Sequence, residues 1–164
     1  MSVLERKAVK NVRNALEHSG VGDTVIELDA TARSAEDAAA AMGCELGAIV
    51  KSLVFKLGET FVLALIAGDR RCLEMALPRV FNLKENVVRP RANEVKVITG
   101  FTIGGVGPIG MREKLPTVID RSFERFSTIY AAAGHPNCVF SITLDNLRCS
   151  TSGFISDEIS LPLK

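Results

Sequence analysis

The residues with the clearest capacity for chemistry lie in a glycine-rich stretch, residues 100–110, which reads GFTIGGVGPIG. Five of these eleven residues are glycine, and glycine loses more conformational entropy on folding than other residues. Backbone amides that no side chain shields are suited to binding a phosphate or a developing oxyanion. We therefore expect this stretch, the glycine loop, to form one wall of an active site. The alternative is a tight turn between two elements.

The glycine loop also contains the spacing G-x-G-x-x-G at Gly105, Gly107 and Gly110, which occurs in dinucleotide-binding fingerprints. That fingerprint requires a strand before it, a helix opening within it and an acidic residue about 20 positions later. Here a helical pattern comes first, Pro108 lies among the glycines and Asp120 comes too early. The context therefore argues against a nucleotide-binding oxidoreductase.

Lys51 is the second candidate, because it interrupts an apolar run, residues 49–55, between Val50 and Ser52. A lysine in a buried strand is costly unless its ammonium group reaches water, an anion or a ligand. Inside a cleft it could bind a phosphate or polarise a carbonyl. It could also extend its stem along a strand edge into water. The residue alone does not decide between these interpretations.

The third candidate is the segment at residues 134–137, which reads GHPN. His135 is available as a general acid or base, and Asn137 could orient a substrate or a water molecule. The composition is also typical of a hairpin turn, and that is the interpretation we prefer. No grouping of an acid, a hydroxyl and a histidine follows from the spacing, so nucleophilic catalysis has no support.

The composition limits the class of protein. With 164 residues, 47% hydrophobic and 24% charged, the chain is expected to form one globular domain. Its net charge of +1 provides no general field for nucleic acid. A loosely basic middle is usually a solvated face and only a local candidate for RNA contact, and it comprises Arg70, Arg71, Lys84, Arg89, Arg91 and Lys96.

Ligand types and hydropathy predict neither a cofactor nor a membrane segment. The four cysteines are far apart, and two histidines cannot complete a zinc site at standard spacing, so we expect no metal. We expect the cysteines to be buried small apolar residues. No stretch is long and apolar enough to span a membrane, so we expect a cytoplasmic protein.

The apolar periodicity predicts the elements that must position these residues. Apolar runs at residues 49–55 and 60–66, joined by a short polar segment, predict a β-hairpin that is covered on both faces. Ser34 is expected to cap a helix that ends at Gly43, and Asp145 to cap a short helical turn. Further helices are predicted at 3–18, 72–81 and 91–98, further strands at 24–28, 117–120, 129–133 and 139–144, and a brief extended piece at 87–88.

Residues 49–55, 100–110 and 134–137 together resemble the YbaK/ProX family, the freestanding relatives of the editing domain inserted in bacterial prolyl-tRNA synthetase. The Lys-Ser strand and the Gly-Gly-x-x-Pro-x-Gly loop carry this resemblance, which runs in the same order over nearly the whole chain. It implies an α/β (α+β) fold over residues 1–164, with a mixed, barrel-like central sheet surrounded by helices. It also implies trans-editing, the hydrolysis of the ester of mischarged tRNA, with tRNA-Pro carrying alanine or cysteine as the expected substrate.

The resemblance also implies roles for single residues. Lys51 matches the essential lysine of the family, which is expected near the phosphate of the terminal adenosine or near the ester. The loop whose amides hold the aminoacyl group is matched by Gly104, Gly105, Val106, Gly107 and Pro108. The residues expected to contact substrate are Ser52, Gly110, His135 and Asn137. Several family members carry other residues at 134–137, so the resemblance gives His135 no catalytic role.

The family uses neither a metal nor a covalent nucleophile, which implies attack by water, a ribose hydroxyl or a substrate thiol. The implied partners are the acceptor end of aminoacyl-tRNA and, as helpers, prolyl-tRNA synthetase or an elongation factor. A non-catalytic module that binds tRNA or a synthetase through the same fold is the alternative. The sequence leaves open which aminoacyl group is removed.

Overall fold

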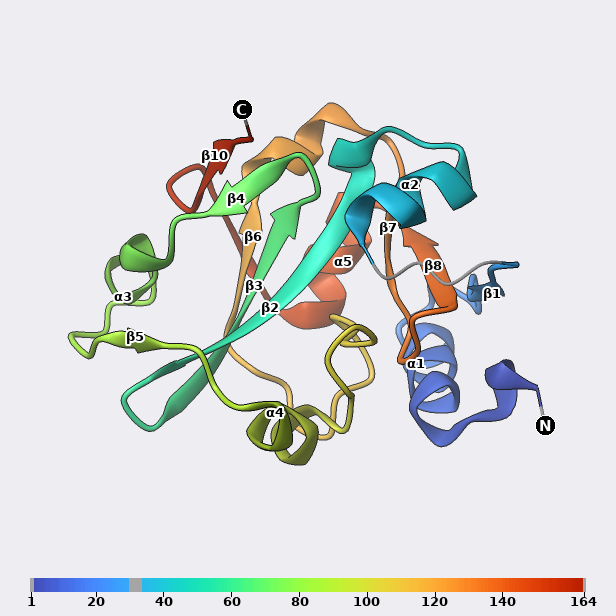
Figure 1. The fold of residues 1–164 in the computed structure, drawn as a ribbon, viewed down its shortest axis with the longest axis horizontal. Helices are drawn as coiled ribbons and strands as arrows, with labels where there is room; N and C mark the ends of the chain where they lie inside the picture. Colours follow the sequence, from blue (N-terminus) through green and yellow to red (C-terminus); the bar gives the residue numbers. More distant parts are fainter. Residues whose placement is uncertain (1, 30–33, 164) are drawn as a thin grey trace.

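The two apolar runs form the hairpin on which the fold is assembled (Figure 1). The computed structural model describes residues 2–29 and 34–163. In it, β2 (Ile49–Leu57) and β3 (Thr60–Ala67) pair antiparallel, with Lys51 opposite Ile66. The connection is the two-residue turn Gly58-Glu59, in which Gly58 has a φ of 63°. The predicted hairpin is thus confirmed, and its strands extend further than expected.

The described residues place this hairpin at the centre of an eight-stranded mixed sheet. Its main order is β1-β8-β7-β2-β3-β6-β9, with β5 paired to β2 as well. The pairs β2–β7, β3–β6 and β6–β9 are parallel, and the other pairs are antiparallel. The strands besides the hairpin are β1 (Ile26–Glu27), β4 (Arg70–Cys72), β5 (Val87–Val88), β6 (Thr117–Asp120), β7 (Ile129–Ala132), β8 (Cys138–Ile142), β9 (Phe154–Ser156) and β10 (Ser160–Pro162).

Helices cover both faces of the sheet, as the apolar pattern of the hairpin predicts. The α-helices are α1 (Lys7–His18), α2 (Ala35–Met42), α3 (Leu77–Val80), α4 (Ala92–Thr99) and α5 (Leu144–Thr151). Helices α1, α4 and α5 contribute Val12, Val95 and Leu147 to the core that includes Leu65 of β3. Leu77 of α3 packs on the opposite face with Phe55 of β2. The predicted mixed sheet with surrounding helices is therefore correct.

The residues predicted to cap helices do so in the structure, with one exception. The Ser34 hydroxyl accepts the Asp37 amide at 3.0 Å, and Gly43 ends α2 with a φ of 67°, both as predicted. The prediction for Asp145 was wrong, because the cap of α5 is Thr143, whose hydroxyl accepts the Asn146 amide at 3.1 Å. The helix therefore begins two residues earlier than a cap at Asp145 would allow, and it takes Leu144 away from the preceding strand.

Two short strands that the sequence did not predict complete the fold. β4 and β10 pair antiparallel in a separate two-stranded sheet, which brings Ser160 opposite Cys72. This pairing joins segments that are about half the chain apart, so no local sequence pattern predicts it. None of the helices in the described part of the chain is long and apolar enough to cross a membrane.

Candidate active site

The candidate site lies along an incomplete edge of β2. On this edge β7 pairs with Ile49 and Val50, and β5 pairs with Lys56 and Leu57. Between these two partners, residues 51–55 pair with β3 on one edge but have no strand on the other edge within the described part of the chain. A cavity of about 520 Å³ occupies this gap, and we call it the edge pocket. Its described lining includes residues 49–55, 89–90, 103–104, 106, 130–132, 136 and 138–139.

The main chain of β2 presents free polar groups to the edge pocket. The Gly68 amide donates to the Ile49 carbonyl at 2.8 Å, so odd-numbered residues of β2 point their polar backbone groups toward β3. Because these groups alternate along an antiparallel strand, the amides and carbonyls of Ser52 and Val54 point toward the gap. None of these four groups has a hydrogen-bond partner within the described residues. The pocket therefore offers donors and acceptors that a ligand can use.

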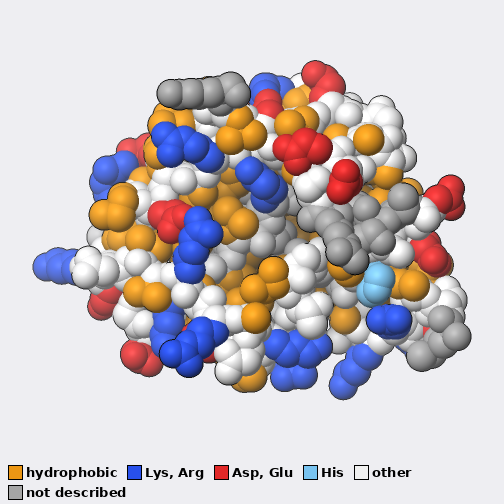
Figure 2. Space-filling model, in the orientation of Figure 1, with side chains coloured by type: hydrophobic (Ala, Val, Ile, Leu, Met, Phe, Trp, Pro, Cys, Tyr) orange, Lys and Arg blue, Asp and Glu red, His pale blue; other side chains and the backbone are white. Residues whose placement is uncertain are grey.

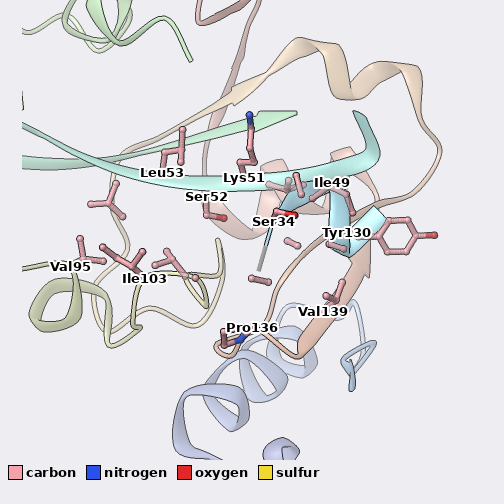
Figure 3. Close-up of a pocket in the computed structure, with 18 of the residues that line it drawn as sticks. Ser34, Ile49, Lys51, Ser52, Leu53, Val95, Ile103, Tyr130, Pro136 and Val139 are labelled. Atoms are coloured by element: carbon pink, nitrogen blue, oxygen red, sulfur yellow. The ribbon is translucent and has the colours of Figure 1, made fainter. Parts of the chain in front are cut away.

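Lys51 and Ser52 extend from opposite faces of β2, because successive side chains of a strand alternate. Figure 3 shows the Lys51 ammonium on one side of the strand and Ser52, Ile103 and Pro136 on the other. The Lys51 Nζ donates to the Arg70 carbonyl. The Ser52 hydroxyl oxygen is buried and has no partner among the described residues. A ligand at the open edge would have the lysine on one side and the hydroxyl on the other.

The surroundings of Lys51 are organised by buried polar groups. Arg70, whose carbonyl accepts the ammonium, donates from Nε to the Ser160 hydroxyl at 2.6 Å and lies 3.8 Å from Asp120. Asp120 is 2% exposed and accepts the Ala67 amide at 3.2 Å. Burial lowers the pKa of Lys51, while nearby acidic groups partly oppose that shift. The β4–β10 pair therefore fixes the acceptor on which the lysine rests.

The charged side chains in the described lining of the edge pocket are all basic. Its described lining includes Lys51 and Arg89 but neither aspartate nor glutamate. Arg89 is paired with Glu74, with Nε and Oε2 3.0 Å apart, whereas Lys51 forms no ion pair within the described residues. Figure 2 shows apolar side chains in the hollow of this face, with lysines and arginines around it. Such a lining favours a ligand that joins an apolar or neutral body to an anionic group.

Only part of the glycine loop reaches the edge pocket. Gly104, with a φ of 97°, and Val106 line it, and their amides have no hydrogen-bond partner within the described residues. The Gly105 amide instead donates to the Thr102 carbonyl at 3.0 Å. Ile103 lines the pocket as well, and its amide is likewise without a partner among the described residues, so three unpaired loop amides lie at this wall of the pocket.

The other loop glycines are explained by close packing of backbone. A Cβ on Gly105 would lie 2.9 Å from the His135 amide nitrogen, and one on Gly107 would lie 2.5 Å from the Ala132 carbonyl oxygen. A Cβ on Gly110 would lie 2.9 Å from the backbone of Val12 in α1. These glycines let the loop approach β7, the 134–137 turn and α1. Their number therefore reflects packing more than ligand contact.

Two of the loop residues predicted as site residues lie elsewhere. Pro108 and Gly110 line a second cavity of about 220 Å³, beside Ala15 of α1 and Thr151 of α5. They are not among the described residues of the edge pocket. The loop thus has one end in the pocket and the other end against the helices that support it.

The segment 134–137 forms the turn between β7 and β8, as predicted, and only Pro136 lines the edge pocket. The Nδ1 of His135 accepts the Asn137 amide at 3.0 Å, and burial lowers the pKa of this histidine. The Oδ1 of Asn137 is buried with no partner in the described chain. Neither side chain lines the pocket, so the turn interpretation accounts for both residues best.

Several lining residues were not among the predicted site residues: Arg89, which was named only for RNA contact, Ile103, which was included only as part of the glycine loop, and Val95, Tyr130 and Cys138. They come from five segments that meet only in the folded chain. In the folded chain Ile103 is 63% exposed although it is apolar, which is a feature of ligand-contacting surfaces that the sequence alone does not show. Cys138 is buried, as predicted, whereas Cys149 is exposed and Cys44 and Cys72 are half-buried, so the prediction for these three cysteines was wrong.

The described lining of the edge pocket includes neither a metal site nor an activated thiol. No group of three or more metal-ligating side chains occurs among residues 2–29 and 34–163. Burial raises the pKa of the Cys138 thiol to about 11, so its nucleophilic thiolate is scarce at neutral pH. The groups that can act on a ligand are the Lys51 ammonium, the Ser52 hydroxyl and the free amides.

Comparison with known proteins agrees with this arrangement. Residues 29–149 match the family model described as the aminoacyl-tRNA editing domain. An uncharacterised Bacillus subtilis protein, YwhH, is 31% identical over 137 residues, which are 83% of this chain and 86% of that protein. A candidate Cys-tRNA(Pro)/Cys-tRNA(Cys) deacylase from Enterococcus faecalis, EbsC, is 29% identical over 73% of each chain.

A solved structure extends the similarity to the whole fold. The crystal structure of a candidate trans-editing enzyme for prolyl-tRNA synthetase superimposes with a TM-score of 0.88 and 34% sequence identity. The alignment covers 95% of this chain and 98% of that one. The similarity therefore includes β2, the glycine loop and the elements that hold them.

Proposed function

We propose that this chain, which belongs to the aminoacyl-tRNA editing domain family, hydrolyses the ester of tRNA-Pro that carries a wrong, small amino acid. The observation that carries the proposal is the open edge of β2, where an ammonium group and unpaired amides of the glycine loop, those of Gly104 and Val106 among them, flank one pocket. Editing and deacylation in general are supported by the family and by its deacylase relative. The identity of the ester is our proposal.

In this proposal the two faces of β2 contact different parts of the substrate. Lys51 lies on the face opposite the glycine loop, so we assign its ammonium to the phosphate of the terminal adenosine. The amides of Gly104 and Val106 are assigned to the ester carbonyl. Water attacks that carbonyl carbon, the bond to the ribose oxygen breaks, and the ribose oxygen takes up a proton. The free amides stabilise the oxyanion that forms in between.

This mechanism depends on positioning and charge, and the pocket is suited to both. Fixed donors in a partly buried site lower the barrier without rearranging at the moment of reaction. The pocket lining around Val50, Ala131 and Cys138 is apolar, which suits a small aminoacyl side chain. A pocket of this kind discriminates by size, where one methylene is worth about 1–3 kcal/mol.

We further propose that one editing domain spans residues 1–164 and that it acts with a helper. One core cluster joins α1 to β9, which supports a single domain. The net charge of +1 provides little general attraction for RNA. Prolyl-tRNA synthetase or an elongation factor is therefore the proposed source of additional tRNA affinity.

A panel of charged tRNAs tests the proposed function. Alanyl-, cysteinyl-, seryl- and prolyl-tRNA-Pro are incubated with excess protein, and the loss of ester is followed under single-turnover conditions. We expect at least one small ester to be cleaved about 10²-fold or more above the uncatalysed rate. Prolyl-tRNA-Pro should remain near the uncatalysed rate.

RNA binding, measured by gel shift with uncharged tRNA-Pro, is the control for this panel. If tRNA binds and no ester is cleaved faster than background, the chain is a binding module and the proposal fails. Cleavage of prolyl-tRNA-Pro alone would contradict the proposed selectivity.

A further inference from the structure

The open edge of β2 has a free acceptor and a free donor two residues apart on the same side of the strand. The Ser52 carbonyl and the Val54 amide point into the same gap and flank Leu53. The next such pair in either direction is unavailable, because Val50 is paired with β7 and Lys56 with β5. Of the four free groups on this edge, the Ser52 carbonyl and the Val54 amide therefore form the one acceptor–donor pair that flanks a single residue, and a planar group with the complementary pair can dock there.

The walls around this pair are apolar and lie on both sides of the strand. Leu53 extends on one side, and Val95 and Ile103 lie on the other (Figure 3). Pro90 and Arg89 close the end near Phe55, and the Arg89 guanidinium lies 6.0 Å from the Phe55 ring. Apolar and guanidinium surfaces are those on which unpaired bases stack in RNA-binding proteins.

The charge of the pocket limits the occupant further. An ammonium ligand would find no carboxylate among the described lining residues, whereas Lys51 can meet a phosphate. The occupant should thus be flat and neutral, with an attached anion. Adenine meets these requirements, because its exocyclic N6 donates and its N1 accepts, and in a nucleotide it carries a phosphate.

We propose that the adenine of the terminal tRNA nucleotide binds the open edge of β2, donating from N6 to the Ser52 carbonyl and accepting at N1 from the Val54 amide. The inference rests on the proposed function and assigns a subsite for the base. It places the ribose beside Ser52, whose buried hydroxyl has no partner in the described chain. The ester carried by that ribose then lies next to Gly104 and Val106.

Binding of adenosine 5′-monophosphate and two analogues, followed by amide NMR shifts, tests the base subsite. The 7-deaza analogue keeps N1 and N6 and should bind within about twofold of the parent nucleotide. The 1-deaza analogue lacks the acceptor for the Val54 amide and should bind about tenfold more weakly. The Val54 amide resonance should move with the first two ligands and hardly with the third.

Equal affinity for the 1-deaza analogue, or shifts confined to another surface, would overturn the proposal. Because these nucleotides carry no ester, the result does not depend on deacylation. If the nucleotides bind as expected but no charged tRNA is deacylated, only the proposed function is refuted. If a charged tRNA is deacylated but the 1-deaza analogue binds as well as the parent nucleotide, only the base subsite is refuted.

A pair of exposed isoleucine and valine variants gives a second test. Ile103→Ala removes part of one wall and should weaken nucleotide binding about threefold to tenfold. Val97→Ala is the matched control, because Val97 is similarly exposed on α4 and does not line the described pocket. Both side chains are more than half exposed, so neither change should disturb folding. Equal weakening in both variants would contradict the inference.

Discussion

Deacylation by the Lys51→Ala variant is expected to be about 10²-fold slower than by the wild-type chain, measured as kcat/KM on the best ester of the panel. The ammonium is the charged group of the edge pocket that forms no ion pair within the described residues, so alanine leaves the terminal phosphate without its partner. Folding should be unaffected, because burial lowers the pKa of Lys51 and thus disfavours its charged form in the folded state.

Lys56→Ala is the matched control for this variant. Lys56 lies on the same strand, pairs with Glu94 at 3.6 Å and does not line the edge pocket, so its loss should change kcat/KM by about twofold at most. Normal turnover by Lys51→Ala, or an equal loss in the Lys56→Ala control, would remove the role assigned to Lys51.

The pH profile gives a second readout of the same role. The pKa of Lys51 lies below the ordinary value of 10.5, so the ammonium is lost, and activity over background falls, at a pH below that value. Lys51→Arg keeps its charge throughout this range. Its residual activity should therefore show no such alkaline decline.

Gly107→Ala is expected to destabilise the protein by about 1–3 kcal/mol and to slow deacylation by about 10²-fold. The added Cβ would lie 2.5 Å from the Ala132 carbonyl oxygen, which belongs to the backbone of β7 and cannot rotate away. The loop must then move, and the neighbouring Val106 amide moves with it. Urea unfolding and single-turnover deacylation measure the two effects.

Gly20→Ala separates the loss of stability from the loss of geometry. Gly20 has a φ of 83° and no atom within 4 Å of the added Cβ, so alanine costs about 1 kcal/mol through backbone strain alone. It lies outside the described pocket lining and should retain deacylation wherever the protein is folded. Retained activity in Gly107→Ala would show that the position of the glycine loop is unimportant.

Much of the fold could be predicted from local patterns. The hairpin of β2 and β3 follows from two apolar runs and a short polar turn, and the start of α2 follows from the capping hydroxyl of Ser34. These features depend on residues close together in the chain. The β4–β10 pair could not be predicted, because its strands are short and about 90 residues apart, as the Arg70–Ser160 contact is.

The candidate site was only partly predictable for the same reason. The residue types of Lys51 and the glycine loop predict that both belong to the site, and both reach the edge pocket. Their relative position could not be predicted from the sequence. Side chains alternate along β2, and the ammonium group of Lys51 lies on the face of the strand opposite the glycine loop. The open edge itself depends on where β7 and β5 stop pairing, which is a property of the assembled sheet.

The glycine loop illustrates how one pattern serves two purposes. Its glycine content predicts a row of ligand-binding amides, yet Gly105, Gly107 and Gly110 are needed where the loop approaches other backbone. Gly104 alone among these four lines the edge pocket. A high glycine content indicates that other atoms approach the backbone of the loop closely. The fold then determines whether those atoms belong to a ligand or to the protein itself.

Amide hydrogen exchange with a hydrolysis-resistant amide analogue of 3′-alanyl-adenosine 5′-monophosphate tests most directly whether the aminoacyl end of tRNA binds along β2. The amides of Ser52, Val54, Gly104 and Val106 have no partner among the described residues of the free chain. On binding the analogue, exchange at Ser52 or Val54 and at Gly104 or Val106 should slow together. Protection confined to the second cavity beside Pro108, or to any other surface, would contradict the account.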